Sequence, residues 1–292
     1  MKSDSSITTA LLEQLSVNST PYVDPINRID WEALNLDAPW LPESAISLYG
    51  VPEFVNTPVE QRIKLSQYEL LHLLEIGLWF ESLFMSRLCD SARVNTDKIS
   101  LATYHLHELR EEAGHGLLFF QLVKRSGLER VVPDKRHAKW FEYLRKRATL
   151  DSSLFWAACL MAEELLDRMH RTLLHDSTGI CPTIQKVIRV YTIDRARHIT
   201  HAKCMVETMI KPLNRWQKWK HQLVLRRVFN QFVRLLYFPS AESYDLAGLM
   251  PGCSWAALAW NNQLRHQYVR QQLETTMRPL KQNGIVLDWY KR

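Results

Sequence analysis

A glutamate and a histidine stand three residues apart in a long stretch without proline. Glu112 and His115 lie within residues 109–118, LREEAGHGLL. On a helix this spacing brings both side chains to one face, one turn apart. A carboxylate and an imidazole in this arrangement can bind one metal ion together. Four-helix bundles that hold two metal ions use such a Glu-x-x-His pair on two helices and a further glutamate on each of the other two.

Four stretches have the pattern of long helices, and each carries acids or histidines. They run over about 60–92, 97–125, 152–175 and 182–209. The first is apolar on all sides, as a buried helix is, so a carboxylate within it is costly unless it is paired or bound to a metal. The candidate ligands are, in chain order, Glu75 or Glu81, then Glu112 and His115, then Glu163 or Glu164, and finally Asp194, His198 and His201. Carboxylates with one imidazole for each ion suit ferrous iron or manganese.

The rest of the sequence predicts an all-α protein with an N-terminal arm. The 292 residues include only 9 glycines, fewer than the turns of a sheet protein need. Residues 1–57, interrupted by prolines from Pro21 onward, are expected to form an irregular arm packed on a helical domain over 58–292. Beyond the four long helices we expect a short basic helix over 135–149, a helix over 212–237, a loop over 239–255 and a last helix over 255–280. In the 212–237 helix, the apolar residues expected to pack against the bundle are Trp216, Trp219, Leu223, Leu225 and Phe229.

Composition restricts the partners and the compartment. The formal net charge is +6 and the basic residues are spread widely, so we expect neither a nucleic acid nor a membrane partner. The 5 cysteines lie far apart and are odd in number, which indicates reduced thiols rather than a disulfide framework. The first residues lack the apolar core of a signal peptide, and no apolar run reaches the roughly 18 residues of a membrane span. We therefore expect a cytoplasmic protein. Nothing in the composition opposes a homodimer.

The motifs resemble those of the p-aminobenzoate N-oxygenase type of di-iron oxygenases, which are ferritin-like proteins that oxidise amines to hydroxylamine, nitroso or nitro groups. The similar stretches, within about 47–285, are SLYGVP, LSQYELLHLLEIGLWFESLF, ELREEAGH, AEELLD and IDRARH. The resemblance implies a ferritin-like bundle with extra helices that holds two irons per chain. It also implies an amine substrate, O₂, an external electron donor and a place in secondary metabolism.

The resemblance also implies a ligand set where helical spacing alone leaves choices. Glu81 is selected over Glu75 because it ends a Trp-Phe-Glu motif. The implied ligands are Glu81, the bridging Glu112, His115 on the first iron, Glu163, and His198 on the second iron. Glu111 and Asp194 would be hydrogen-bond partners of the opposing histidines and fix their ring orientation. Glu75 would then need another buried partner, either His72 or a basic residue.

The fourth helix departs from the family pattern His-x-x-x-Glu-x-x-His. Tyr191 replaces the first histidine, and Arg195 replaces the carboxylate. A guanidinium stays protonated and cannot bind a metal. Tyr191 is expected to be a core aromatic with a hydrogen bond, and it joins Glu112 and Arg195 as a candidate for a direct part in catalysis.

Three interpretations of this departure remain open. In the first, Asp194 or His201 replaces the lost ligand. In the second, Arg195 pairs with Glu112 or Glu163, and only one metal binds, through Glu81, Glu112 and His115. In the third, the protein is a non-catalytic scaffold in which Arg195 takes the place of an ion. The pairing of Arg195 predicts that a second metal position is empty or weakly held.

Overall fold

The computed structural model describes residues 2–94, 98–131, 139, 142, 149–274 and 276–289. These residues form helices and connecting segments, and no strand occurs among them. The predicted all-α fold is therefore confirmed. The short basic helix expected over 135–149 falls almost entirely outside the described residues.

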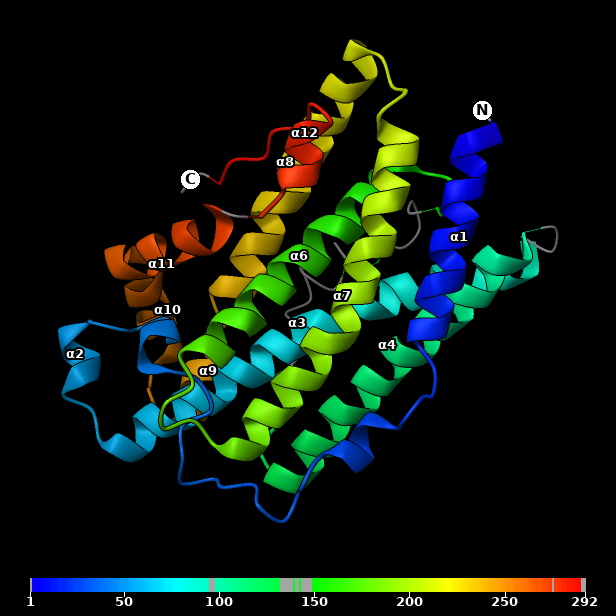
Figure 1. Cartoon of the computed structure of the whole chain (residues 1–292). Helices are drawn as coiled ribbons and strands as arrows, with labels where there is room; N and C mark the ends of the chain where they lie inside the picture. Colours follow the sequence, from blue (N-terminus) through cyan, green and yellow to red (C-terminus); the bar gives the residue numbers. More distant parts are fainter. Residues whose placement is uncertain are drawn as a thin grey trace.

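The four predicted long helices are present and form the centre of the bundle (Figure 1). They are α3 (Val59–Val94), α4 (Ile99–Ser126), α6 (Ser153–His175) and α7 (Pro182–Ile210). Helix α3 packs against α4, and α6 packs against α7. Gly127 ends α4 as expected, because its φ of 65° is a left-handed conformation that glycine adopts without strain.

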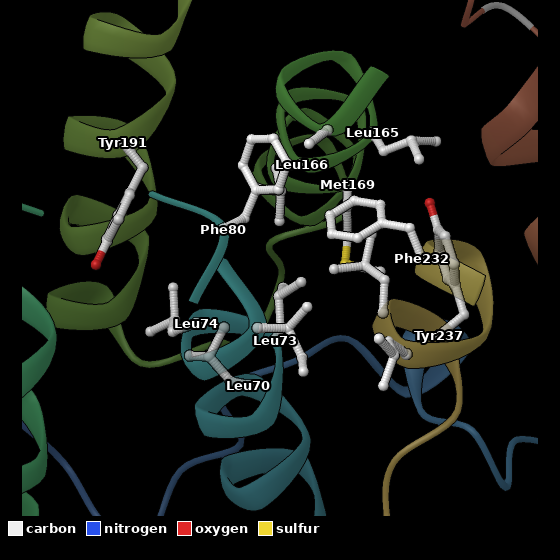
Figure 2. Close-up of a cluster of buried hydrophobic side chains, with 14 of the residues drawn as sticks. Leu70, Leu73, Leu74, Phe80, Leu165, Leu166, Met169, Tyr191, Phe232 and Tyr237 are labelled. Atoms are coloured by element: carbon white, nitrogen blue, oxygen red, sulfur yellow. The ribbon is translucent and has the colours of Figure 1, made fainter. Parts of the chain in front are cut away.

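An apolar cluster joins α3 and α6 to α8 (Arg215–Tyr237), the helix predicted over 212–237. Figure 2 shows side chains from the three helices facing one another: Leu70, Leu73, Leu74 and Phe80 of α3, Leu165, Leu166 and Met169 of α6, and Phe232 and Tyr237 of α8. The rings of Phe80 and Phe232 have centroids 5.7 Å apart. Because Phe80 precedes Glu81 in the chain, this packing fixes the height and rotation of the helix turn that carries the acid.

The N-terminal segment differs from the predicted irregular arm, because Lys2–Asn18 forms helix α1. No proline precedes Pro21, so nothing in these residues opposes a helix. Leu12 and Leu15 of α1 pack against Tyr104 of α4. The rest of the arm is irregular as expected and contains only the short helices η1 (Pro25–Arg28), η2 (Glu43–Ala45) and α2 (Pro52–Val55).

The C-terminal part also differs from the prediction of one loop and one helix. The expected loop contains α9 (Ala241–Leu246), and the expected helix is divided into α10 (Gly252–Asn261), α11 (Gln263–Glu274) and α12 (Arg278–Gln282). Asn262 adopts an extended conformation between α10 and α11, with ψ 113°. Its side-chain amide donates to the carbonyl oxygens of Ser47 and Tyr49 in the arm. Contact with the arm, far away in the sequence, therefore stabilises the break.

The prediction that the apolar residues of α8 pack against the bundle is confirmed for one face of the helix and wrong for the other. Leu225 and Phe229 are buried, whereas Trp216 is 72% exposed, Trp219 is 53% exposed and Leu223 is 38% exposed. No helix in the described part of the chain is long and apolar enough to cross a lipid bilayer.

Candidate metal centre

The four central helices bring five of the predicted ligands together in the interior. Two groups of donors could each hold a metal ion, and within each group the donor atoms lie within 4.8 Å of one another. The two groups are Glu81, Glu112 and His115, and Glu112, Glu163 and His198. All five side chains are buried. Glu112 belongs to both groups, as a bridging carboxylate must.

The inner nitrogen of each histidine faces one oxygen of Glu112. Nδ1 of His115 lies 3.1 Å from Oε2, and Nδ1 of His198 lies 3.0 Å from Oε1. Nδ1 of His115 also lies 3.7 Å from Oε1 of Glu81. Ligand atoms about 2.1 Å from one ion can be up to about 4.2 Å apart, so these separations suit a shared ion.

One pair of these buried atoms has no hydrogen bond. His198 Nδ1 and Glu112 Oε1 are close to each other but not aligned as donor and acceptor, and neither has another hydrogen-bond partner among the described residues. Buried polar atoms are normally satisfied, and an exception indicates a missing water or ion. The residues present therefore fit a divalent metal ion, with Glu112 between the two histidines.

The outer nitrogen of each histidine faces a carboxylate on the opposite helix, as the family resemblance implies. Nε2 of His115 lies 3.3 Å from Asp194, and Nε2 of His198 lies 3.0 Å from Glu111. Arg197, which was not among the predicted site residues, donates to Glu111 at 2.8 Å and to Asp194 at 2.6 Å. Its position three residues after Asp194 on one helix was the available signal. Arg197 connects the two supports and so helps to fix both rings.

Arg195 lies inside the centre and is 1% exposed. Its guanidinium donates to Glu163 at 2.7 Å and to Glu81 at 2.9 Å. The predicted pairing with Glu163 is confirmed. The second partner is Glu81 and not Glu112, because Glu112 faces the two histidines. Arg195 thus connects the outer carboxylates of the two metal-binding groups.

Burial and neighbouring charges shift the pKa values of these acids in opposite directions. Burial raises the pKa of Glu163 to about 7, although Arg195 opposes the shift. Burial would also raise the pKa of Glu112, but His198 and His115 lower it below its usual range. When Glu81, Glu112 and Glu163 are all ionised, they carry three negative charges, and Arg195 neutralises one of them. One divalent ion would neutralise the remaining two negative charges.

Two of the predicted ligands lie outside both metal-binding groups. Nδ1 of His201 lies 2.9 Å from Glu108, one turn away from the centre, and its ring packs against Trp156. Burial, with a smaller effect from His198, lowers the pKa of His201 to about 3. Asp194 lies on the outer side of His115. The expectation that Asp194 or His201 replaces the lost ligand is therefore not supported by their positions, because other partners already hold both side chains.

Tyr191 is buried, and its hydroxyl donates to the backbone carbonyl oxygen of His115 at 2.9 Å. The centroid of its ring lies 4.6 Å from that of His115 (Tyr191 is also seen in Figure 2). The expected core aromatic with a hydrogen bond is confirmed. His170, which sequence analysis missed, is also buried and lies 5.5 Å from Tyr191 between ring centroids. Burial lowers the pKa of His170, and Arg195 lowers it further, so this imidazole is neutral.

Glu75 and Glu164, the alternatives to Glu81 and Glu163, both lie outside the metal-binding groups. Glu164 accepts the backbone N–H of Met277 at 2.7 Å and lies 3.4 Å from Lys203. Glu75 accepts two hydrogen bonds of 2.6 Å from Arg130 and one of 2.7 Å from Trp79. The expected partner of Glu75 is thus a basic residue. The other candidate, His72, lies 2.7 Å from the carbonyl oxygen of Leu235.

Arg130→Ala is expected to destabilise the protein without changing its metal content. The substitution leaves the buried carboxylate of Glu75 without its cation, which costs about 1–3 kcal/mol. Denaturant unfolding measures the loss, and elemental analysis measures the metal. Arg125→Ala is the matched control, because Arg125 pairs with Glu32, which is 85% exposed, and such pairs contribute little. A lower metal content in the Arg130 variant would place Glu75 in the centre.

Two uncharacterized mycobacterial proteins are similar in sequence to this chain. The uncharacterized proteins Mb0909 of Mycobacterium bovis and Rv0885 of Mycobacterium tuberculosis are 25% identical over 209 residues, which is 69% of this chain. The matched region spans 60% of the length of these relatives.

Two solved structures of R2-like ligand-binding oxidase variants share the fold. One holds an anaerobically reconstituted Mn/Fe cofactor and has a TM-score of 0.56, and one holds an aerobically reconstituted Mn/Fe cofactor and has a TM-score of 0.54. Each is 14% identical to this chain, with coverage of 98% of this chain and 94% of the other. The fold is thus the ferritin-like bundle that the sequence predicts. The family model of the p-aminobenzoate N-oxygenase AurF matches residues 3–284, and the chain belongs to this family.

Proposed function

We propose that this protein is an O₂-dependent oxygenase with a carboxylate-rich metal centre formed by Glu81, Glu112, His115, Glu163 and His198. The position of Glu112 is the observation that carries the proposal. Its two oxygens face one histidine each, in a site from which solvent is excluded. Membership of the AurF family supports oxygenase chemistry in such a site.

The donor set favours iron or manganese. Carboxylate oxygens with one imidazole for each ion suit these metals better than the softer ones that cysteine binds. The solved relatives of the same fold contain Mn and Fe. When bound, such a redox-active ion would supply electrons to O₂ and the oxidising power for the substrate.

The protein's own residues hold and shield the ion. Asp194 and Glu111 fix the rings of His115 and His198, so that the inner nitrogens stay directed at Glu112. All five side chains of the centre are buried from solvent, and Phe80, the neighbour of Glu81 in the chain, packs in the apolar cluster of α3, α6 and α8 (Figure 2). Exclusion of water protects a reactive oxidising centre from side reactions.

Arg195 distinguishes this centre from one with four carboxylates. Its two ion pairs occupy oxygens of Glu81 and Glu163 that would otherwise bind metal. We therefore assign one firmly held ion per chain and a weak second position. The same two ion pairs favour a second candidate function, a scaffold protein that keeps the bundle without the chemistry.

The substrate class follows from the family. An aryl or alkyl amine would be oxidised at nitrogen, with O₂ as oxidant and an external protein or small molecule as electron donor.

Anaerobic loading followed by exposure to air tests the proposal. The protein is loaded with Fe²⁺, with Mn²⁺ or with both, freed of excess metal, and mixed with a chemical reductant, O₂ and p-aminobenzoate or an alkyl amine. The expected result is O₂ uptake that requires bound metal, together with a product one oxygen atom heavier than the amine. Bound metal without O₂ uptake would support the scaffold instead. O₂ uptake without an oxidised amine would reject N-oxygenation alone.

A further inference from the structure

The outward face of α8 carries exposed aromatic and basic side chains with no acid among them. Between Thr208 and Ala241 the chain has no aspartate or glutamate. The same segment has seven lysines and arginines: Lys211, Arg215, Lys218, Lys220, Arg226, Arg227 and Arg234. A formal charge of +6 for all 292 residues therefore hides a strongly basic region. The even spread of basic residues assumed from composition does not hold here.

The exposed residues of α8 form one stripe along the helix. Trp216, Lys220, Leu223, Arg227 and Arg234 recur at spacings of three, four or seven residues, which places them on one side. All five are exposed, while the opposite side of α8 is buried in the apolar cluster. At a rise of about 1.5 Å per residue, the stripe from Trp216 to Arg234 is about 27 Å long.

The N-terminal end of the stripe is apolar. Trp216 and Trp219 contact each other edge to face, with ring centroids 5.9 Å apart. Leu223 and Val224 continue this patch and are 38% and 43% exposed. The turn between α7 and α8 lies at one extremity of the molecule (Figure 1). These tryptophans are thus accessible to a large flat partner.

The C-terminal half of the stripe borders a basic cavity. Arg226, Arg227 and Arg234 line a cavity of about 380 Å³ together with Trp260 and Trp289. Arg226 pairs with Asp288 at 3.3 Å, so Arg227 and Arg234 supply the net positive charge of this cavity. The guanidinium of Arg234 lies 4.9 Å from the ring centroid of Trp260. Guanidinium groups bind phosphate through paired hydrogen bonds, and a cavity of this composition suits a phosphate headgroup.

We propose that the outward face of α8 binds an anionic phospholipid surface. A stripe of tryptophan, aliphatic and basic side chains on one helix is the pattern of interfacial helices, in which the aromatic rings lie at the level of the headgroups and the cations contact anionic lipids. The straight stripe fits a plane. A second copy of the chain would bring the same cations against each other, so a symmetric contact of this face with itself is disfavoured.

Vesicle sedimentation with the full chain tests this proposal. Vesicles of phosphatidylcholine that contain about one third phosphatidylglycerol should bind the protein at least tenfold more tightly than pure phosphatidylcholine vesicles, because each cation near an anionic surface adds to binding. High salt should weaken binding, and the tryptophan emission should shift to shorter wavelength on binding. Equal affinity for both vesicle types, or no sedimentation with either, would overturn the proposal. The second result is the outcome expected if the face serves an acidic protein.

Two double variants test the contributions of the tryptophans and of the cations to vesicle binding separately. Trp216→Ser with Trp219→Ser should remove the emission shift and weaken binding, and Arg215→Glu with Lys220→Glu should weaken binding at least about tenfold. Leu106→Ser with Leu117→Ser on α4 is the matched control, since both leucines are about half exposed, at 51% and 53%. The four α8 side chains are exposed, so their replacement should leave the fold intact, as circular dichroism would check. Unchanged vesicle binding by both α8 variants would refute the assignment of this face.

Discussion

Arg195→Glu should raise the iron content after anaerobic loading from about one ion to about two ions per chain, the number held by bundles of this type. The substitution removes the guanidinium that occupies Glu81 and Glu163, and it places a carboxylate where the family pattern has one. Elemental analysis after removal of excess iron measures the content. Absorption spectra on exposure to O₂ show whether the second ion changes the reaction.

Arg195→Gln separates the two effects of this substitution. Glutamine removes the positive charge but supplies only a weak neutral oxygen, so its iron content should lie below that of the glutamate variant. Because both changes leave buried carboxylates without their cation, the unloaded variants should be less stable than the natural chain, by about 3–5 kcal/mol. Stability should therefore be measured with and without iron. If the natural chain already holds two ions tightly, Arg195 does not limit loading and this account fails.

His115→Ala should remove most of the bound metal while the helical content stays unchanged. Its Nδ1 faces both Glu81 and Glu112, so the substitution takes away the imidazole of one metal-binding group. Loss of a residue that only supports a ligand lowers metal affinity about 10–100-fold, and the loss of a direct ligand should exceed this range. Competition with a chelator, read by elemental analysis, gives the affinity.

His201→Ala is the matched control for this prediction. His201 is equally buried and lies on the same bundle, but its partner is Glu108 and it belongs to neither metal-binding group. Its replacement should cost stability and leave the metal content near that of the natural chain. The opposite order, with iron kept by the His115 variant and lost by the His201 variant, would mean that the centre lies one turn further along α4 and α7.

The sequence determined the helices and the residues that α3, α4, α6 and α7 bring to the centre. The apolar pattern is strong enough over these long stretches to specify a buried helix, and a buried carboxylate requires a partner. Glu112 and His115 follow from their spacing, since residues three apart share a face. Their outer supports, Glu111 and Asp194, could also be anticipated once the two histidine helices were aligned by resemblance.

Other features depended on contacts between residues far apart in the chain. Helical spacing alone did not distinguish Glu75 from Glu81 as the metal ligand of the first long helix. In the structure, Glu75 pairs with Arg130, which lies 55 residues later in the chain. The break at Asn262 likewise depends on carbonyl groups of the N-terminal arm. Such contacts have no local signal, so a helix that looks continuous in the sequence can be interrupted.

The orientation of the charged and aromatic side chains was decided in the same way. Sequence identified Arg195 as an anomaly, but only the arrangement of α3, α6 and α7 determined that its two partners are Glu81 and Glu163. The apolar residues of α8 were all expected to pack against the bundle. The face with Leu225 and Phe229 does so, and this leaves the face that carries Trp216 and Trp219 exposed to solvent. The sequence indicates which residues are apolar enough to be buried, and the packing of the whole chain determines which of these residues are buried.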